Sequence, residues 1–275
     1  MHAAATKKKI SPQQLSFSSY LKRCWAYRRF LFTLSRRDIK AKYAQTVLGI
    51  LWVVLQPLTG LAIFTLFFQE FIPLDTGTIP YPLFAFTGIV AWYFFAYIVT
   101  AAGSTLMENQ DLIKKVYFPK LILPLTKVML GLVDFGITFL LLIVGVLLSG
   151  YGLSWALLSI PFFLLLNIIS GLAIAIWLSA LTLQYRDLYH IIPYLINFAI
   201  WLTPVFYPGT IIPEAYDWVL YINPMAFVIA GFRWALLGDV MPNIYYLISL
   251  IPVLLLCTTG FLYFIRVEQK MVDIL

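Results

Sequence analysis

Composition excludes an ordinary soluble domain, because 62% of the 275 residues are hydrophobic and only 11% are charged. The net charge of +7 does not indicate nucleic-acid binding: eleven of the nineteen lysines and arginines lie between Lys7 and Lys42, ahead of the first long apolar segment. Cations gathered there suit anionic lipid headgroups and cytoplasmic retention. The chain therefore predicts an integral membrane protein with a cytoplasmic N-terminus.

Apolar segments of near-spanning length recur along the chain and predict six transmembrane helices. They cover residues 46–69, 83–105, 121–148, 156–181, 191–207 and 244–265. Seventeen of the nineteen lysines and arginines fall in segments 1–45, 106–120, 182–190 and 266–275, which the positive-inside rule assigns to the cytoplasm. The outer segments are then 70–82, 149–155 and 208–243, and both termini are cytoplasmic.

We expect a single domain over residues 1–275. A cytoplasmic tail with an interfacial helix occupies 1–45, a six-span region 46–265, and a second cytoplasmic tail 266–275. Lys7–Lys9 precede polar sequence, so no cleaved signal peptide is expected.

Residues 15–36 form an amphipathic segment. Its apolar stripe, at 4-3-4-3 spacing, consists of Tyr20, Cys24, Tyr27, Leu31 and Leu34. We expect a helix in the inner membrane interface with this stripe toward lipid. Its role is either plain anchoring or recruitment of an anionic lipid-linked substrate.

Segment 208–243 contains two apolar, helix-capable stretches that are each too short to cross a membrane. Prolines interrupt it, and Gly238 offers a helix stop. We expect two short re-entrant helices on the outer side, between the fifth and sixth spans. Arg233 would then lie at an interface or line a watery cavity. The predicted fold class is an all-α membrane protein.

No catalytic, cofactor-binding or metal-binding constellation is present in the sequence. The only histidines, His2 and His190, have no zinc-like spacing, and no Walker A motif is found. Cys24 and Cys257 do not suggest a disulfide framework. We expect no enzyme activity and no cofactor in this chain.

Asp134 is the one acidic residue deep in a predicted span, which marks it as a functional candidate. Lys127, two helical turns earlier, shares its face and could snorkel inward. A polar contact between helices or subunits is favoured over a proton relay, which would need more ionisable groups.

The inner loop 107–119, MENQDLIKKVYFP, predicts a short amphipathic helix that ends before Pro119. Its apolar face would consist of Leu112, Ile113, Val116 and Tyr117. A compact surface with charges of both signs suits docking to a soluble partner. An ordinary solvated helix is the alternative reading.

Aromatic residues occur throughout the spans, and those near span ends suit the interfacial belt. Rings deeper inside either face lipid or stack on sugar faces in a channel. The channel or gate candidates are Trp52, Asp134, Phe198, Trp201, Phe206, Tyr207 and Arg233.

Four stretches, in this order, carry a family resemblance: KAKYAQTVLGILWVVLQP (40–57), QDLIKKVYFPKLILP (110–124), QYRDLYHIIPYLINFAIWLTPVFYP (184–208) and YINPMAFVIAGFRWALLG (221–238). They resemble the permease subunit of ABC-2-type polysaccharide exporters, which export O-antigens, teichoic acids and capsule polymers. The resemblance covers essentially the whole chain.

The resemblance implies a homodimer of permeases with two copies of a separate ATPase beneath it. That partner would carry the Walker A motif and hold ATP and magnesium. The implied substrate is a polysaccharide on an undecaprenyl diphosphate carrier, and the implied location is the bacterial inner membrane, as in lipopolysaccharide biosynthesis.

The resemblance also implies roles for particular segments. Segment 107–118 matches the coupling helix, residues 15–36 the interfacial helix, and residues 213–237 the short outer helices. The expected coupling residues are Glu108, Gln110, Asp111, Lys114, Lys115 and Tyr117. The cations expected to recruit the lipid diphosphate are Arg28, Arg29, Arg36, Arg37 and Lys40.

Three alternatives remain at this point. An ABC-2 exporter of a drug or small lipid fits less well, given the basic interfacial cluster and the four motifs. An ion-coupled carrier would transport without ATP. An integral-membrane glycosyltransferase would need paired carboxylates for a metal-bound nucleotide sugar, and no inner loop offers them.

Overall fold

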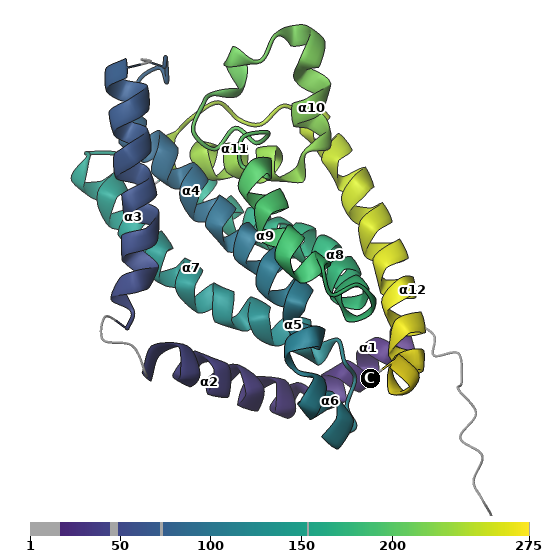
Figure 1. Ribbon diagram of the computed structural model, residues 1–275. Helices are drawn as coiled ribbons and strands as arrows, with labels where there is room; N and C mark the ends of the chain where they lie inside the picture. Colours follow the sequence, from purple (N-terminus) through teal and green to yellow (C-terminus); the bar gives the residue numbers. More distant parts are fainter. Residues whose placement is uncertain (1–16, 45–48, 72–73, 153, 275) are drawn as a thin grey trace, which may run out of the picture.

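The computed structural model describes residues 17–44, 49–71, 74–152 and 154–274, and this part of the chain is helical with no strand (Figure 1). The predicted all-α class is therefore confirmed for these residues. The Lys7–Lys9 tail, the first residues of the predicted interfacial helix and residues 45–48 at the predicted start of the first span lie outside the described residues.

The α-helices are α1 (Phe17–Ala26), α2 (Arg28–Ala44), α3 (Leu51–Thr65), α4 (Tyr81–Tyr97), α5 (Gly103–Glu108), α6 (Gln110–Lys115), α7 (Ile122–Leu148), α8 (Ile160–Gln184), α9 (Leu188–Ala199), α10 (Asp217–Ile222), α11 (Pro224–Leu237) and α12 (Leu250–Ile274). Two π-helical segments, Leu66–Phe71 and Ile98–Ala102, extend α3 and α4. Short 3-10 turns cover Trp155–Ser159, Gly209–Ile211, Glu214–Tyr216 and Ile244–Ser249.

Among the described residues, five helices are long and apolar enough to cross a membrane, and a bent helix pair raises the number to as many as six. The five are Leu51–Gln69, Tyr81–Glu108, Ile122–Leu148, Trp155–Gln184 and Ile244–Met271. In the bent pair, Glu214–Ile222 and Pro224–Leu237 meet at 93°. This bend follows the sequence, because Pro224 begins α11 and Asn223 caps it by accepting a hydrogen bond from the Met225 amide.

The predicted fifth span, 191–207, is shorter than expected. Helix α9 has 12 residues and ends at Ala199, so it is about 18 Å long, against roughly 30 Å for a hydrocarbon core. Residues 200–207 form turns instead. Pro204 and Pro208 follow within nine residues of Ala199, and each lacks the amide hydrogen that a continuing helix needs.

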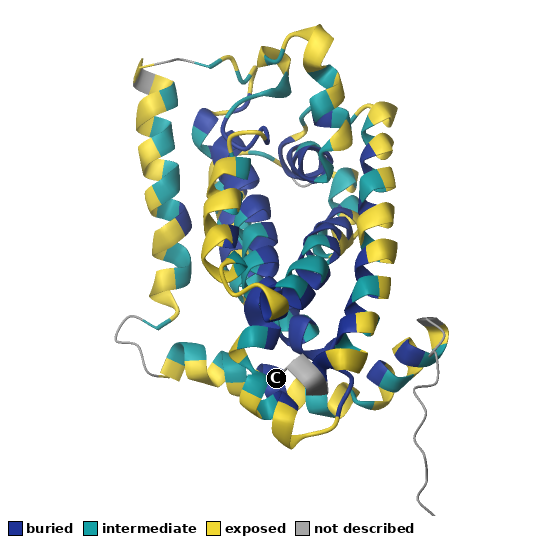
Figure 2. Cartoon of the chain, turned by 45° about the vertical axis from the view of Figure 1, so that its right-hand side comes forward, coloured by how far each residue is buried: buried dark blue, intermediate teal, exposed yellow. Residues whose placement is uncertain are grey.

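Helix α4 occupies the middle of the bundle, whereas α3 stands at its edge (Figures 1 and 2). Most of the apolar window of the α4 span is buried, 78%, but only 6% of the α3 window is. Small residues let helices approach closely. At Gly131 of α7, a Cβ atom would lie 2.7 Å from the Tyr97 ring of the α4 span, and at Gly231 of α11 it would lie 2.2 Å from the ring of Phe163.

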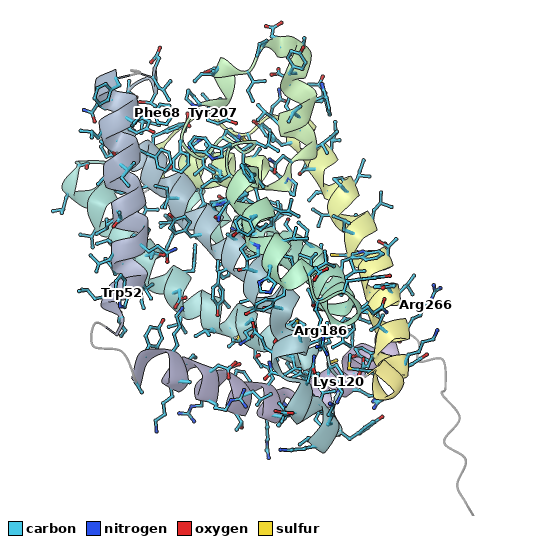
Figure 3. All side chains as sticks on the ribbon, viewed as in Figure 1. Trp52, Phe68, Lys120, Arg186, Tyr207 and Arg266 are labelled. Carbon is cyan, nitrogen blue, oxygen red and sulfur yellow. The ribbon has the colours of Figure 1, made fainter. Side chains whose placement is uncertain are left out.

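Helices α1, α2 and α6 and the end of α12 gather at one end of the bundle, opposite α10 and α11 (Figure 1). Figure 3 places Lys120 and Arg266, from two predicted inner segments, toward that end, and Phe68 and Tyr207 toward the other. Below, "inner end" denotes the end with α1, α2 and α6. The predicted tail 266–275 is helical through Ile274, because α12 continues into it.

The predicted apolar stripe of the N-terminal helices packs on the bundle, not outward. Tyr20, Cys24 and Leu34 are buried in a cluster with Ile113 and Phe264. The 4-3-4-3 spacing thus identified the correct face, but the prediction that this face meets lipid is wrong.

Candidate functional site

A cavity of about 430 Å³ lies between α3, α4, α7 and α9, and the end of α2 reaches its wall. Its lining is mixed in chemistry. Aromatic rings come from Trp52, Trp92, Tyr93 and Tyr97, and polar groups from Lys42, Gln56, Thr100, Asp134 and Asn197. Such a volume is in the range of small-ligand sites, which combine apolar walls with a few polar groups.

Asp134 is the charged centre of this cavity. It lies about 18 Å along α7 from its inner end, and its carboxylate accepts hydrogen bonds from the Lys42 ammonium and the Tyr43 phenol. Both donors belong to α2. The favoured reading of Asp134 as a polar contact between helices therefore agrees with the structure.

Lys127, which shares a face of α7 with Asp134, pairs with other side chains. Its Nζ lies 3.4 Å from Oδ2 of Asp38 in α2 and 3.7 Å from Oε2 of Glu108 in α5. The two α7 residues thus face the same helix α2 but bind different side chains.

The gate candidates lie in four different places. Trp52 and Asp134 line the cavity. Phe206 is buried and stacks on Phe64 with ring centroids 3.4 Å apart, and the Tyr207 hydroxyl donates a hydrogen bond of 2.9 Å to the Trp201 carbonyl. These residues form an aromatic cluster beyond the end of α9.

Phe198 and Arg233 occupy different surroundings. The Phe198 side chain is 70% exposed on the bundle surface and does not line the cavity. Arg233 is buried, with its guanidinium 3.4 Å from the centre of the Phe84 ring. The expectation that it lies at an interface or in a watery cavity is wrong.

The predicted docking segment 107–119 contains the last two residues of α5 and all of α6, and the chain turns between these helices at Asn109. Ile113 anchors α6 in the buried cluster at the inner end. The expected apolar face does not extend further, because the helix ends at Lys115 and Val116 is extended and exposed. The residues exposed on this surface are Glu108, Asp111, Lys114, Lys115, Val116 and Tyr117, and Gln110 is half-buried.

One contact at the inner end was not expected from the sequence. The Glu268 carboxylate of α12 accepts hydrogen bonds from the Tyr20 hydroxyl of α1 and, at 3.0 Å, from the Lys120 amide. Burial and the nearby carboxylate raise the pKa of the Tyr20 phenol, so it remains a donor. Burial lowers the pKa of Lys120, whose ammonium donates to the Val116 carbonyl at 3.2 Å. Glu268 follows the last apolar segment, and this acidic residue was the signal in the sequence that could have indicated a polar contact there.

All five predicted recruitment cations, Arg28, Arg29, Arg36, Arg37 and Lys40, are exposed on α2. Two have partners within the N-terminal region. The Arg28 guanidinium lies 5.5 Å from the centre of the Trp25 ring, and Arg37 pairs with Asp38 at 2.8 Å.

Among the described residues, no group of three or more histidine, cysteine or acidic side chains could hold a metal ion. Cys24 is buried, and burial raises the pKa of its thiol to about 11. Its thiolate is therefore scarce at neutral pH.

Residues 29–237 match the family described as ABC-2 type transporter. The chain belongs to this family. The matched region contains every cavity-lining residue, whereas α1 and α12 of this ABC-2 chain lie outside it.

Curated relatives of this ABC-2 protein carry the name O-antigen export system permease protein RfbA. One from Klebsiella pneumoniae is 30% identical over 247 residues, which cover 89% of this chain and 94% of the relative. Another from Myxococcus xanthus is 29% identical over 211 residues, or 76% of this chain and 80% of the relative. A further Klebsiella pneumoniae protein is 28% identical over 247 residues.

Proposed function

We propose that this ABC-2 chain is the membrane subunit of an ATP-driven exporter that moves a lipid-linked polysaccharide, of O-antigen or teichoic-acid type, across the bacterial inner membrane. The observation that carries the proposal is the cavity of about 430 Å³ in the helix bundle, which aromatic and polar side chains line together. The names of the relatives, which refer to O-antigen export, supply the substrate class.

The lining of the cavity suits a sugar chain. The Trp52, Tyr93 and Tyr97 rings offer flat apolar faces for sugar C–H groups, and the Gln56 and Asn197 amides can exchange hydrogen bonds with hydroxyls. A purely apolar ligand would leave these polar groups without partners, at an energetic penalty. This mixture favours a saccharide over a small lipid.

The energy for export must come from a partner protein that hydrolyses ATP, because the sequence has no Walker A motif. The exposed surface of α5 and α6 carries Asp111, Lys114 and Lys115 close together, with the apolar Val116 beside them. Charges of both signs around an apolar centre suit a protein–protein interface. Two permease copies and two ATPase copies, which hold ATP and magnesium, complete the proposed exporter.

The anionic carrier would first meet the inner end of the permease. Exposed cations of α2, including Arg29, Arg36 and Lys40, attract phosphate, each contributing about 1 kcal/mol near an anionic surface. This assignment places the inner end in the cytoplasm, with α1 and α2 along the membrane interface and the α10–α11 pair re-entrant on the outer side.

Proteoliposomes test the proposal. Permease and ATPase are reconstituted with lipid-linked polymer, and the polymer that becomes accessible to an added glycosidase is measured. We expect movement with ATP, none with an ATPase altered in its Walker A lysine, and none with an ion gradient alone. Movement driven by the gradient without ATP would instead identify an ion-coupled carrier.

A further inference from the structure

Helix α2 connects the predicted docking segment to the cavity. In its first half, Leu34 is buried in the same cluster as Ile113 of α6, and the Phe30 ring lies 5.0 Å from that of Phe118. At its other end, Lys42 lines the cavity. The helix has 17 residues and is therefore about 25 Å long; Figure 1 shows it lying across the inner end of the bundle.

Two ion pairs of opposite polarity fasten α2 to α7. Asp38 of α2 pairs with Lys127, and Lys42, one turn further, pairs with Asp134, with Tyr43 as a second donor. The acid is on α2 in the first pair and on α7 in the second. If α2 slid by one turn, Lys42 would approach Lys127 or Asp38 would approach Asp134, and like charges repel. The pairs therefore specify one register of α2 on α7.

The same network reaches the docking segment and the cavity wall. Lys127 also contacts Glu108 at 3.7 Å, and Glu108 is the last residue of α5. At the cavity, the Lys42 ammonium lies 5.1 Å from the centre of the Tyr97 ring, in the span of α4. A continuous chain of contacts thus joins α5, α7, α2 and α4.

The Lys42–Asp134 pair is exposed enough to separate and re-form. The side chains of Lys42 and Asp134 are 34% and 19% exposed, and a partly solvated pair is far weaker than a fully buried one. Asp134 also accepts a hydrogen bond from the Tyr43 hydroxyl, so two neighbouring side chains of α2 hold this carboxylate. Such pairs can position a helix in one of two discrete arrangements.

We propose that α2 is a rigid rod that carries movement of α6 into the cavity, with Asp38, Lys42, Lys127 and Asp134 as its positioning residues. The inference rests on the proposed function, in which an ATPase moves α6. The inference adds the side chains that transmit this movement to the cavity.

The test measures how accessible the cavity wall is to a water-soluble reagent, and it needs no polysaccharide. Cys24→Ser and Cys257→Ser remove the native thiols, and Thr100→Cys places a reporter on the cavity wall. The rate of its modification by a water-soluble maleimide is measured in the permease–ATPase complex, without nucleotide and with ATP plus vanadate. We expect nucleotide to change this rate about 5- to 150-fold, the usual size of coupling between sites.

Charge removal and charge exchange distinguish positioning from simple stability. Lys42→Met and Lys127→Met should abolish the nucleotide effect while the ATPase still co-purifies. The double exchange Lys42→Asp with Asp134→Lys should restore at least half of the nucleotide effect. The exchange Asp38→Lys with Lys127→Asp should do the same when Glu108→Gln removes the carboxylate that would otherwise face the new aspartate. Lys22→Met, at an exposed lysine of α1, is the matched control and should respond like the parent.

Three results would overturn the inference: an unchanged nucleotide effect in both methionine variants, exchanges that fail to restore it, or no effect in the parent complex. If a methionine variant loses the ATPase, the exchanges decide the matter in the same way. A parent complex that responds to nucleotide but moves no polymer would refute the exporter and leave the rod intact.

Discussion

The guanidinium of Arg233 donates a hydrogen bond of 2.8 Å to the carbonyl oxygen of Val205, so a buried cation of α11 holds the turn that follows α9. A second, longer bond of 3.3 Å reaches the Phe84 carbonyl in α4. This arrangement joins the two segments that depart most from a regular span, the short α9 and the bent α10–α11 pair, to the central helix.

Removing the donor should destabilise the permease. Arg233→Met leaves the Val205 carbonyl without its guanidinium donor, and an unsatisfied buried group costs about 1–3 kcal/mol. We expect a lower Tm in detergent, and size-exclusion chromatography measures any aggregation of the variant. Gly88→Ala tests the same turn from α4, because its Cβ atom would lie 2.5 Å from the Val205 oxygen. Gly136→Ala, which meets nothing within 4 Å, is the control. Equal Tm values for both alanine variants would contradict this account of the turn.

Charge reversal on the docking surface should weaken binding of the proposed ATPase. Asp111→Arg is the cleaner change, because Glu108 also pairs with Lys127 and accepts a 2.7 Å hydrogen bond from Ser104. A like charge placed in an interface can cost several kcal/mol. We expect less ATPase to co-purify with Asp111→Arg, while Glu214→Arg at the opposite end has no effect. Full co-purification with Asp111→Arg would move the docking site elsewhere.

Neutralising the exposed cations of α2 should reduce export steeply, although any single change is tolerated. Each cation contributes about 1 kcal/mol at an anionic surface. The multiple variant replaces Arg28, Arg29, Arg36 and Lys40 with glutamine and leaves Arg37, which pairs with Asp38. The measurement is polymer at the cell surface.

Two controls accompany that variant. Orientation is checked by labelling, since these cations also favour a cytoplasmic N-terminus. Arginine-to-lysine replacements keep the charge but lose the bidentate fork toward phosphate. Wild-type export from a correctly oriented glutamine variant would reduce the segment to an anchor.

The proposed orientation can be tested with single cysteines in a cysteine-free background. Thr78→Cys and Tyr216→Cys lie on exposed positions at the end opposite α6 and should react with an impermeant thiol reagent in intact cells. Lys114→Cys should react only after permeabilisation. Ile113 is unsuitable for this test because it is buried and would remain unreactive on either side. Reaction of Lys114→Cys in intact cells would reverse the assigned sides.

The sequence predicted the helical class and most of the spans, because long apolar runs are local properties. The sequence could not reveal whether a given helix face packs against lipid or against another helix. The Tyr20, Cys24 and Leu34 stripe was recognisable by its spacing, but only tertiary structure shows that it packs on α6 and α12. Hydropathy likewise marked 191–207 as apolar without showing that the helix ends at Ala199.

Long-range pairing was the other gap. Lys127 was the nearest cation to Asp134 along the helix, yet the actual partner, Lys42, is 92 residues away in sequence. Helical spacing identifies side chains that share a face, and it carries no information about a neighbouring helix that supplies a better donor. The cavity depends on such contacts, so its location could not be derived from the chain alone.

The bond between Tyr20 and Glu268 joins residues 248 positions apart, and it has a consequence for biogenesis. At roughly 5–20 residues per second of synthesis, α1 waits about 12–50 seconds before α12 emerges to receive it. Until then the Tyr20 and Cys24 side chains lack their α12 neighbours, and a chain that is truncated before Glu268 has a first helix with an incomplete binding surface. The packing of α1 at the inner end can therefore be completed only after the last helix has been translated.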